Sequence, residues 1–364
     1  MKIHRPSLHP SGLTLLELLV VLTILVALST VAITSTSGVA DQARYEATQR
    51  TLENVKEAIL GPPNMLNADG SPLRIGFVAD MGRLPQASPV TSIAGGTGTG
   101  YTLNELWAQG GMAAYEVRIS SNDPEIRLGT GWRGPYVQFA PGDFQAAPPP
   151  QLRDGWGVEF ATRNGTIPGF PNDHLLDSSG NPVVAGTAVA QVVSFGMNDL
   201  VGGSGTYDRP LPIVINDSDF TVEIFFQVQL RKLDPAATFP VSTSANFSVV
   251  VGLFGPDPST GLIRFIYDDY KTITSPPPSQ YVSSRSPNAL ISGFGTNTLT
   301  FSTAFTRSPT DPPLTVGPRV LRAYYSPDSA TPPVTSGTSV PKSSVSYFTA
   351  LPGQNFRTLV INVP

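Results

Sequence analysis

The stretch that decides the fold is an apolar run near the N-terminus, SGLTLLELLVVLTILVALSTVAI at residues 11–33. Residues 13–33 contain no Lys, Arg or Asp, and the run reaches the ~20 residues that a helix needs to cross a bilayer. It holds one acid, Glu17, and an ionisable group inside such a run is costly and usually functional. A secretory signal peptide has a shorter apolar core with a small-residue cleavage site after it. The run therefore predicts a membrane span at residues 13–33.

The charges on either side of this run set its predicted orientation. Lys2 and Arg5 precede it, and the first charge after it is Asp41. Because cytoplasmic flanks carry the excess of Lys and Arg, we expect the leader in the cytoplasm and the bulk of the chain outside. The sequence thus predicts a single-pass inner-membrane protein with a periplasmic or extracellular body.

The composition of the 364 residues narrows the class of protein. The net charge is −4 with no large basic block, so nucleic acid is not an expected partner. Cys is absent, which excludes disulfides, thiol catalysis and thiolate metal sites. Charged residues make up 14% of the chain, whereas Gly and Pro number 34 and 36. This mixture favours a β-rich extracytoplasmic body with many turns over a helical cytosolic enzyme.

The residues around Gly12 resemble a known processing site. The segment GLTLLE at residues 12–17 is similar to the cleavage site of type IV prepilins and type II secretion pseudopilins. The resemblance implies that prepilin peptidase cuts after Gly12 and methylates the new amine of Leu13, and that Glu17 is the family's assembly acid. Leu13 stands in place of the commoner phenylalanine, and Thr34 stands where many members carry a helix-bending proline.

One long helix is predicted over residues 13–60. Its second half is amphipathic, with Tyr45, Leu52, Val55 and Ile59 at helical spacing. Gly61 and the two prolines after it end the helix, because Gly favours a C-cap and Pro cannot continue. We therefore divide the chain into a leader at 1–12, the helix at 13–60, a pseudopilin-like α+β head at 61–215 and a further module at 216–364.

Two short segments of the head carry a second resemblance. Gly134-Pro135-Tyr136 and DGWG at residues 154–157 are similar to the Gly-Pro-Tyr and Asp-Pro-Trp-Gly segments of the major pseudopilin head, with Gly155 in place of the proline. In physical terms, Tyr136 and Trp156 are expected to be core aromatics that anchor a sheet against the helix. Strands are predicted at 113–120, 134–139, 154–160 and 189–195.

The polar loop at residues 196–208 follows the last of these strands. It resembles the loop that holds calcium in the major pseudopilins, which implies a calcium ion bound by Asn198, Asp199 and Asp208, with Asn198 in place of the family's first acid. Calcium takes six to eight oxygens from carboxylates, amides, carbonyls and water. Asn, Asp and Gly are also common in ordinary polar turns, and that alternative stays open.

The C-terminal module is expected to be a β-sandwich. Strand-like runs separated by proline-rich turns lie at 220–230, 247–254, 262–267, 299–305, 319–325, 345–350 and 357–363. The resemblance does not cover this module. The expected fold class is therefore α+β: a long N-terminal transmembrane and amphipathic helix packed on a small pilin-like antiparallel sheet, followed by a β-sandwich domain.

The sequence offers little for catalysis, and we expect no enzyme. The three histidines cannot make a multi-histidine metal site, since His4 and His9 lie in the leader and only His174 remains. No G-x-S-x-G segment is present. Glycoside hydrolysis needs two facing carboxylates, and a sugar site needs exposed aromatics. The candidates are the pairs Asp217 and Asp219, Asp268 and Asp269, and Tyr324 and Tyr325.

The expected function is that of a structural subunit of a type II secretion pseudopilus or a type IV pilus-like filament. Its expected partners are prepilin peptidase, other pilin or pseudopilin subunits and an inner-membrane assembly platform. The alternative is a pilin-anchored cell-surface adhesin, or a carbohydrate-binding or hydrolytic protein.

Overall fold

The structure is a computed structural model of the chain. It describes residues 15–66, 73–85, 88–90, 100–138, 152–157, 161–164, 167–168, 188–194, 196–198, 205, 207–209, 211–239, 248–271, 280–283, 289–292, 295–304, 314–326 and 341–364. The processing site at Gly12 and Leu13 lies outside these residues.

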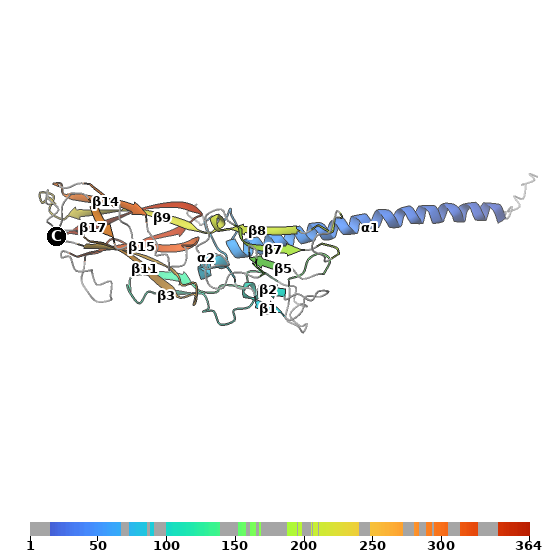
Figure 1. The fold of residues 1–364 in the computed structure, drawn as a ribbon, viewed down its shortest axis with the longest axis horizontal. Coiled ribbons are helices and arrows are strands. Elements are labelled where there is room, and N and C mark those ends of the chain that lie inside the picture. The colour runs from blue at the N-terminus through green and yellow to red at the C-terminus, as the bar shows by residue number, and fades with distance from the viewer. Residues whose placement is uncertain are drawn as a thin grey trace, which may run out of the picture.

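A 46-residue helix, α1 (Leu15–Leu60), begins the described part of the chain. Figure 1 shows its first half projecting from an elongated body and its second half running into that body. The helix stops at Gly61, whose φ of +84° suits glycine and whose Cα faces the backbone of Ile75. A Cβ at this position would lie 2.7 Å from the Ile75 carbonyl oxygen.

The structure of the apolar half of α1 contradicts two sequence predictions, the membrane span and the membrane location. In the part of the chain that the structure describes, no helix combines the length and the apolar character needed to cross a membrane. Glu17 lies among the apolar side chains described at residues 15–31, and an ionisable group inside a span is costly. The predicted membrane span at 13–33 and the inner-membrane, single-pass location derived from it are therefore wrong.

Short elements surround the packed half of α1. A four-stranded antiparallel sheet in the order β6-β5-β7-β8 lies along the helix (Figure 1), with Val192 and Ile215 buried in the core. Two small antiparallel pairs, β1-β2 and β3-β4, complete the head. The elements are α2 (Phe77–Met81), β1 (Ser88–Val90), β2 (Gly100–Thr102), η1 (Asn104–Leu106), β3 (Glu116–Ile119), β4 (Arg127–Thr130), β5 (Ala161–Asn164), β6 (Ile167–Pro168), β7 (Ala188–Ser194), β8 (Leu211–Asn216) and η3 (Asp217–Asp219).

The largest part of the fold is a sheet of nine strands in the order β16-β15-β10-β11-β12-β13-β14-β9-β17. All neighbours are antiparallel except β17 and β9, which run parallel over eleven residue pairs. The strands are β9 (Val222–Lys232), β10 (Ser248–Pro256), β11 (Ile263–Lys271), β12 (Gln280–Ser283), β13 (Ala289–Ser292), β14 (Thr298–Ala304), β15 (Gly317–Ser326), β16 (Ser346–Ala350) and β17 (Gly353–Val363).

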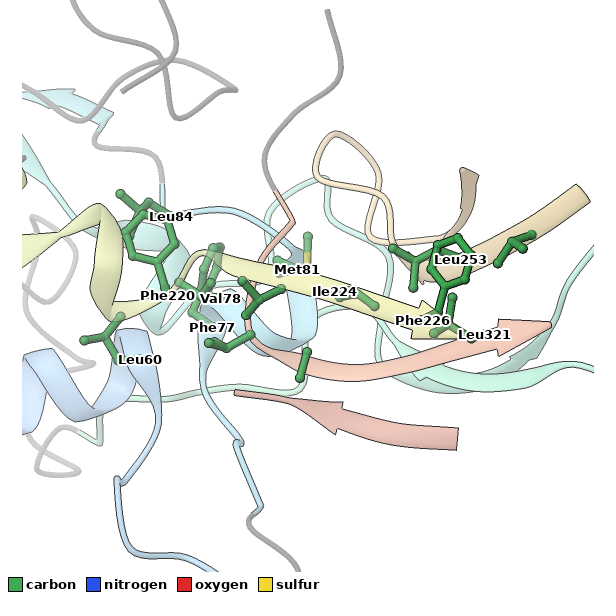
Figure 2. Packing of buried hydrophobic residues seen from close by; sticks show 14 of the residues in the cluster. Leu60, Phe77, Val78, Met81, Leu84, Phe220, Ile224, Phe226, Leu253 and Leu321 are labelled. Carbon is green, nitrogen blue, oxygen red and sulfur yellow. The ribbon is translucent and has the colours of Figure 1, made fainter. Parts of the chain in front are cut away.

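The inner faces of this sheet meet as in a β-sandwich. Along β9, alternate residues are buried from Val222 to Leu230, as the period of two requires. Figure 2 shows Phe226 of β9 beside Leu253 of β10 and Leu321 of β15, so both ends of the strand order contribute to one core. Burial of each such side chain stabilises the fold by roughly 1.5–3 kcal/mol.

The same core continues from the sandwich into the head. Figure 2 shows Leu60 of α1 and Phe77 and Met81 of α2 next to Phe220 and Ile224 at the start of β9. At Gly317, where φ is +115°, a Cβ would lie 2.7 Å from the Cα of Ala79. Helix α2 therefore covers the base of the sandwich. The predicted boundary between residues 215 and 216 stays a prediction, and it falls inside β8.

The predicted fold class is wrong, because the described chain is mostly β-strand and contains no helix able to span a membrane. Strand prediction was mixed in detail. The strand expected at 189–195 corresponds to β7, whereas the described part of 134–139 forms no strand. Strands β12 and β13 were not predicted.

Candidate functional site

The most unusual surface of the described molecule is the first half of α1. Every residue at 15–31 is exposed, and the apolar side chains cover all sides of the helix, with Leu15 83% and Val31 65% exposed. A helix that is apolar all round is buried in its functional state. Large exposed apolar patches mark interaction sites. This half of the helix is therefore the candidate interaction site.

Glu17 lies on this exposed half, in the first turn of α1. A carboxylate in the first turn interacts favourably with the positive end of the helix dipole. Burial of this carboxylate in an assembly requires a charged or hydrogen-bonding partner. The positions predicted to be cut and methylated, Gly12 and Leu13, lie outside the described residues.

The second half of α1 is held by the turn at residues 154–157. The Gly155 amide donates to the Thr48 hydroxyl at 2.9 Å, and a Cβ on Gly155 would overlap the Arg44 carbonyl oxygen. The Asp154 carboxylate holds the turn in place. It accepts a hydrogen bond from the Trp156 amide at 3.0 Å and one from the Ser194 hydroxyl at 2.6 Å. Glycine at 155 is thus required by direct contact between the turn and the helix backbone.

Trp156 does not form the fully buried anchor that the sequence predicts. Its side chain is half-buried, and its buried indole Nε1 has no hydrogen-bond partner in the part of the chain that the structure describes. Tyr136 does pack against the core, edge-on to Phe77 at 5.6 Å and to Trp132 at 6.1 Å.

The polar loop predicted to bind calcium contacts the second half of α1. The Met197 amide donates to the Tyr207 carbonyl at 2.9 Å, which brings the two ends of the loop together. The Tyr207 ring lies edge-on to Tyr45 at 6.0 Å, and its hydroxyl donates to Gln42 at 3.2 Å. The loop is therefore anchored to the helix through Tyr207.

The predicted calcium ligands are only partly brought together. Among the described residues, the buried Oδ1 atom of Asp208 has no hydrogen-bond partner, and a cation can satisfy such an oxygen. Asn198 lies exposed on a turn, and Asp199 lies outside the described residues. Among the described residues, no group of three His, Cys, Asp or Glu could hold a metal ion. The fit to calcium therefore rests on Asp208.

A buried carboxylate that the sequence did not reveal lies in α2. The side chain of Asp80 is fully buried, and it accepts from Arg133 Nη2 at 3.0 Å and from the Tyr136 hydroxyl at 2.9 Å. Burial raises the pKa of the Asp80 carboxyl to about 6, although Arg133 and then Tyr136 act in the opposite direction. Burial and the nearby Asp80 charge also raise the pKa of Tyr136. These contacts join α2 to the segment after β4.

A second polar cluster joins the head to the sandwich. Arg322 of β15 donates to Asp123 at 2.9 Å and to Glu125 at 2.6 Å, and Lys342 also pairs with Glu125. The hydrogen bond from Lys342, followed by that from Arg322, lowers the pKa of Glu125. The Tyr324 hydroxyl donates to Asp123 at 2.8 Å. This cluster is a structural connection between two parts of the chain.

The residues considered for catalysis or sugar binding have other roles or lie outside the described chain. Tyr324 and Tyr325 are buried, so this pair offers no sugar-binding surface. Asp268 and Asp269 are consecutive residues of β11, and their side chains lie outside the described part of the structure. Asp219 accepts from the Asn216 amide in a capping box around η3. The histidines, His4, His9 and His174, lie outside the described residues.

Comparison with known proteins adds no relative to this picture: no family model, no curated protein and no solved structure matches the chain.

Proposed function

We propose that this protein is a structural subunit of a filament of the type II secretion pseudopilus or type IV pilus kind, joined to copies of itself through residues 15–31 of α1. The observation that carries the proposal is the apolar, fully exposed first half of α1, which projects from the body in Figure 1. A second copy of the same helix offers the matching apolar surface, and a bundle of such helices would remove it from water.

The resemblance at residues 12–17 supports the same proposal from the sequence. Prepilin peptidase would cut after Gly12, and an assembly platform would add the processed subunit to the filament. The new amine at Leu13 would then pair with Glu17 of a neighbouring subunit, because a carboxylate buried in a bundle needs a partner. The β-rich body would lie on the outside of the bundle.

Cysteine cross-linking tests the packing directly, because the natural chain contains no Cys. Leu25→Cys places a thiol on the exposed half of α1, and Ser259→Cys places one on an exposed turn of the body. In assembled material, oxidation is expected to give disulfide-linked dimers and larger species from Leu25→Cys and monomers from Ser259→Cys. Equal cross-linking of both variants, or monomers from both, would reject assembly through α1.

Intact-mass measurement tests the processing step separately. The expected mature mass corresponds to cleavage between Gly12 and Leu13 with one added methyl group. Gly12→Val is expected to block the cut, since it adds bulk beside the scissile bond. A mature protein that keeps residues 1–12 in a host with the peptidase would contradict this part of the proposal.

A further inference from the structure

Two aromatic rings lie together on the outer face of the sandwich. Phe225 of β9 and Phe356 of β17 are direct partners in the parallel register. Their ring centroids are 5.0 Å apart with 19° between the planes, and Phe356 is 66% exposed. A single exposed apolar side chain is common on a protein surface, but two stacked aromatic rings form a larger apolar patch, and apolar patches can mark interaction sites. The ring pair is therefore a candidate contact surface.

The position of β17 leaves one side of the pair open. β17 is the last strand of the nine-stranded sheet, so among the described strands none pairs beyond it. The Phe225 ring stacks on the Phe356 ring, and Phe356 still keeps 66% of its surface exposed. An aromatic ring that is already held in place loses little entropy when a ligand stacks on it.

Polar side chains continue this surface along β9. The outward positions after Phe225 are Gln227, Gln229 and Arg231, which the two-residue period places on one face. The Arg231 guanidinium donates to Gln229 at 2.9 Å, and the Gln229 amide donates to Gln227 at 3.1 Å. The row from Phe225 to Arg231 extends for roughly 20 Å. Its amides are thus oriented before any ligand arrives.

The charge of this row selects the class of ligand. Glu223 precedes Phe225 and Arg231 ends the row, so the two opposite charges lie at its ends and uncharged amides lie between them. Nucleic acids and acidic peptides need an excess of positive charge, which the described outward residues of β9 do not supply. A neutral sugar has an apolar ring face and hydroxyl groups around its rim. The apolar face can stack on an exposed aromatic ring, and the hydroxyls can hydrogen-bond to neighbouring amides.

We propose that the Phe225–Phe356 ring pair and the amide row of β9 form a binding surface for a neutral polysaccharide. A sugar ring stacks on Phe356, and hydroxyls of the following sugars bond to Gln229 and Arg231, whose remaining N–H groups are donors. Strands β9 and β17 belong to the sandwich, away from the projecting half of α1 (Figure 1), and the inference does not depend on filament assembly.

Binding of the full chain to defined polysaccharides tests the inference. The probes are insoluble cellulose, chitin and xylan in sedimentation assays, and soluble β-glucan, starch and galactomannan in affinity gels. Retention by at least one of these neutral polymers is expected, with little change between about 0.05 and 0.5 M NaCl because no charge pairing is involved. Retention by none, or binding that salt abolishes, would overturn the inference.

Substitutions assign the binding to the ring pair. Phe356→Ala is expected to weaken binding about tenfold or more, whereas Phe356→Trp keeps it, since an aromatic face remains. Leu233→Ala is the matched control, because Leu233 is also 66% exposed but lies beyond the far end of the row. Gln229→Ala is expected to weaken binding less than Phe356→Ala. Circular dichroism checks that each variant is folded.

Two results would reject the assignment. Equal losses in Phe356→Ala and Leu233→Ala would show that binding does not involve the rings. Concentration-dependent self-association of the parent chain in sedimentation velocity, lost in Phe356→Ala and accompanied by no glycan binding, would identify the surface as a contact between copies instead.

Discussion

The two halves of α1 belong to one continuous helix but bury opposite amounts of apolar surface. Residues 15–31 are apolar on all sides and exposed, whereas from Tyr45 onward the apolar residues form one stripe that the body covers. Ile59 has no exposed surface, while Leu22 is 57% exposed. The comparison separates a half that serves folding from a half that, in the proposed function, serves association.

The largest expected effect separates these two roles. Ile59→Ala deletes a fully buried side chain and should lower the free energy of unfolding by about 2–5 kcal/mol, because it leaves a cavity. Leu22→Ala should leave that free energy unchanged within error, since Leu22 touches solvent and Ala favours helix. Chemical denaturation measures both, and sedimentation of assembled filaments should show a loss for Leu22→Ala. A large stability loss from Leu22→Ala would erase the distinction between the halves.

The next effect concerns Asp80 in α2, which helps to cover the packed half of α1. Its folded-state pKa of about 6 lies above the unfolded value of 3.8, so the folded state binds the proton more tightly. Stability from this group is therefore present below pH 3.8 and is lost as the pH rises to about 6, by up to ~3 kcal/mol. The groups facing Asp80 are Arg133 and Tyr136.

Asp80→Asn isolates this contribution, because the amide does not titrate. From pH 4 to pH 6, the unfolding free energy of the parent is expected to fall relative to that of Asp80→Asn. Above pH 7 the difference between the two should stay constant. Urea titrations at several pH values measure it. A difference independent of pH would mean that the Asp80 carboxyl has the same pKa in the folded and unfolded states.

A smaller effect tests the turn that seats the body on α1. Gly155→Ala places a Cβ against the Arg44 carbonyl and should cost about 1–3 kcal/mol through overpacking. Gly157→Ala in the same turn is the control: its φ is +86°, but no atom lies within 4 Å of the added Cβ. It should cost only about 1 kcal/mol of backbone strain. Thermal unfolding that ranks the two variants the other way would show that the turn does not rest on the helix.

The sequence predicted the parts of this fold that follow a local period. The apolar stripe from Leu52 to Ile59 repeats about every 3.6 residues, and the alternation along β9 repeats every two residues. In both segments the buried residues follow that period. Gly134-Pro135-Tyr136 resembled a strand by composition but forms a loop, because Tyr136 is fixed by a contact with Asp80, fifty-six positions away. No local pattern contains that contact.

The candidate surfaces divide in the same way. The exposed apolar half of α1 can be recognised in sequence because it is long and uniform. Asp80 could not be recognised, since a single acid in a short helix carries no pattern. Phe225 offered a weak signal, an aromatic at an outward position of VEIFFQVQLRK, but only the parallel pairing of β9 with the distant β17 places Phe356 beside it. Long-range strand order is what the sequence lacks.

The smallest expected effect is that of calcium on the loop at residues 196–208, which is attached to α1 through Tyr207. We propose that Asp208, Asn198 and Asp199 bind the ion, with the buried, unpaired Oδ1 of Asp208 as the first ligand. Weak calcium sites bind in the range of about 10⁻⁴–10⁻³ M, so ~5 mM calcium should add about 1–2 kcal/mol to stability by mass action. Melting of the full chain in calcium and in chelator measures this, and Asp208→Asn should abolish the difference.

Because Tyr207 joins the loop to Gln42 and Tyr45, bound calcium should also slow hydrogen exchange in the adjacent turn of α1. Identical melting with and without calcium, together with no metal by elemental analysis, would leave the loop as a polar turn held to the helix by Tyr207 alone.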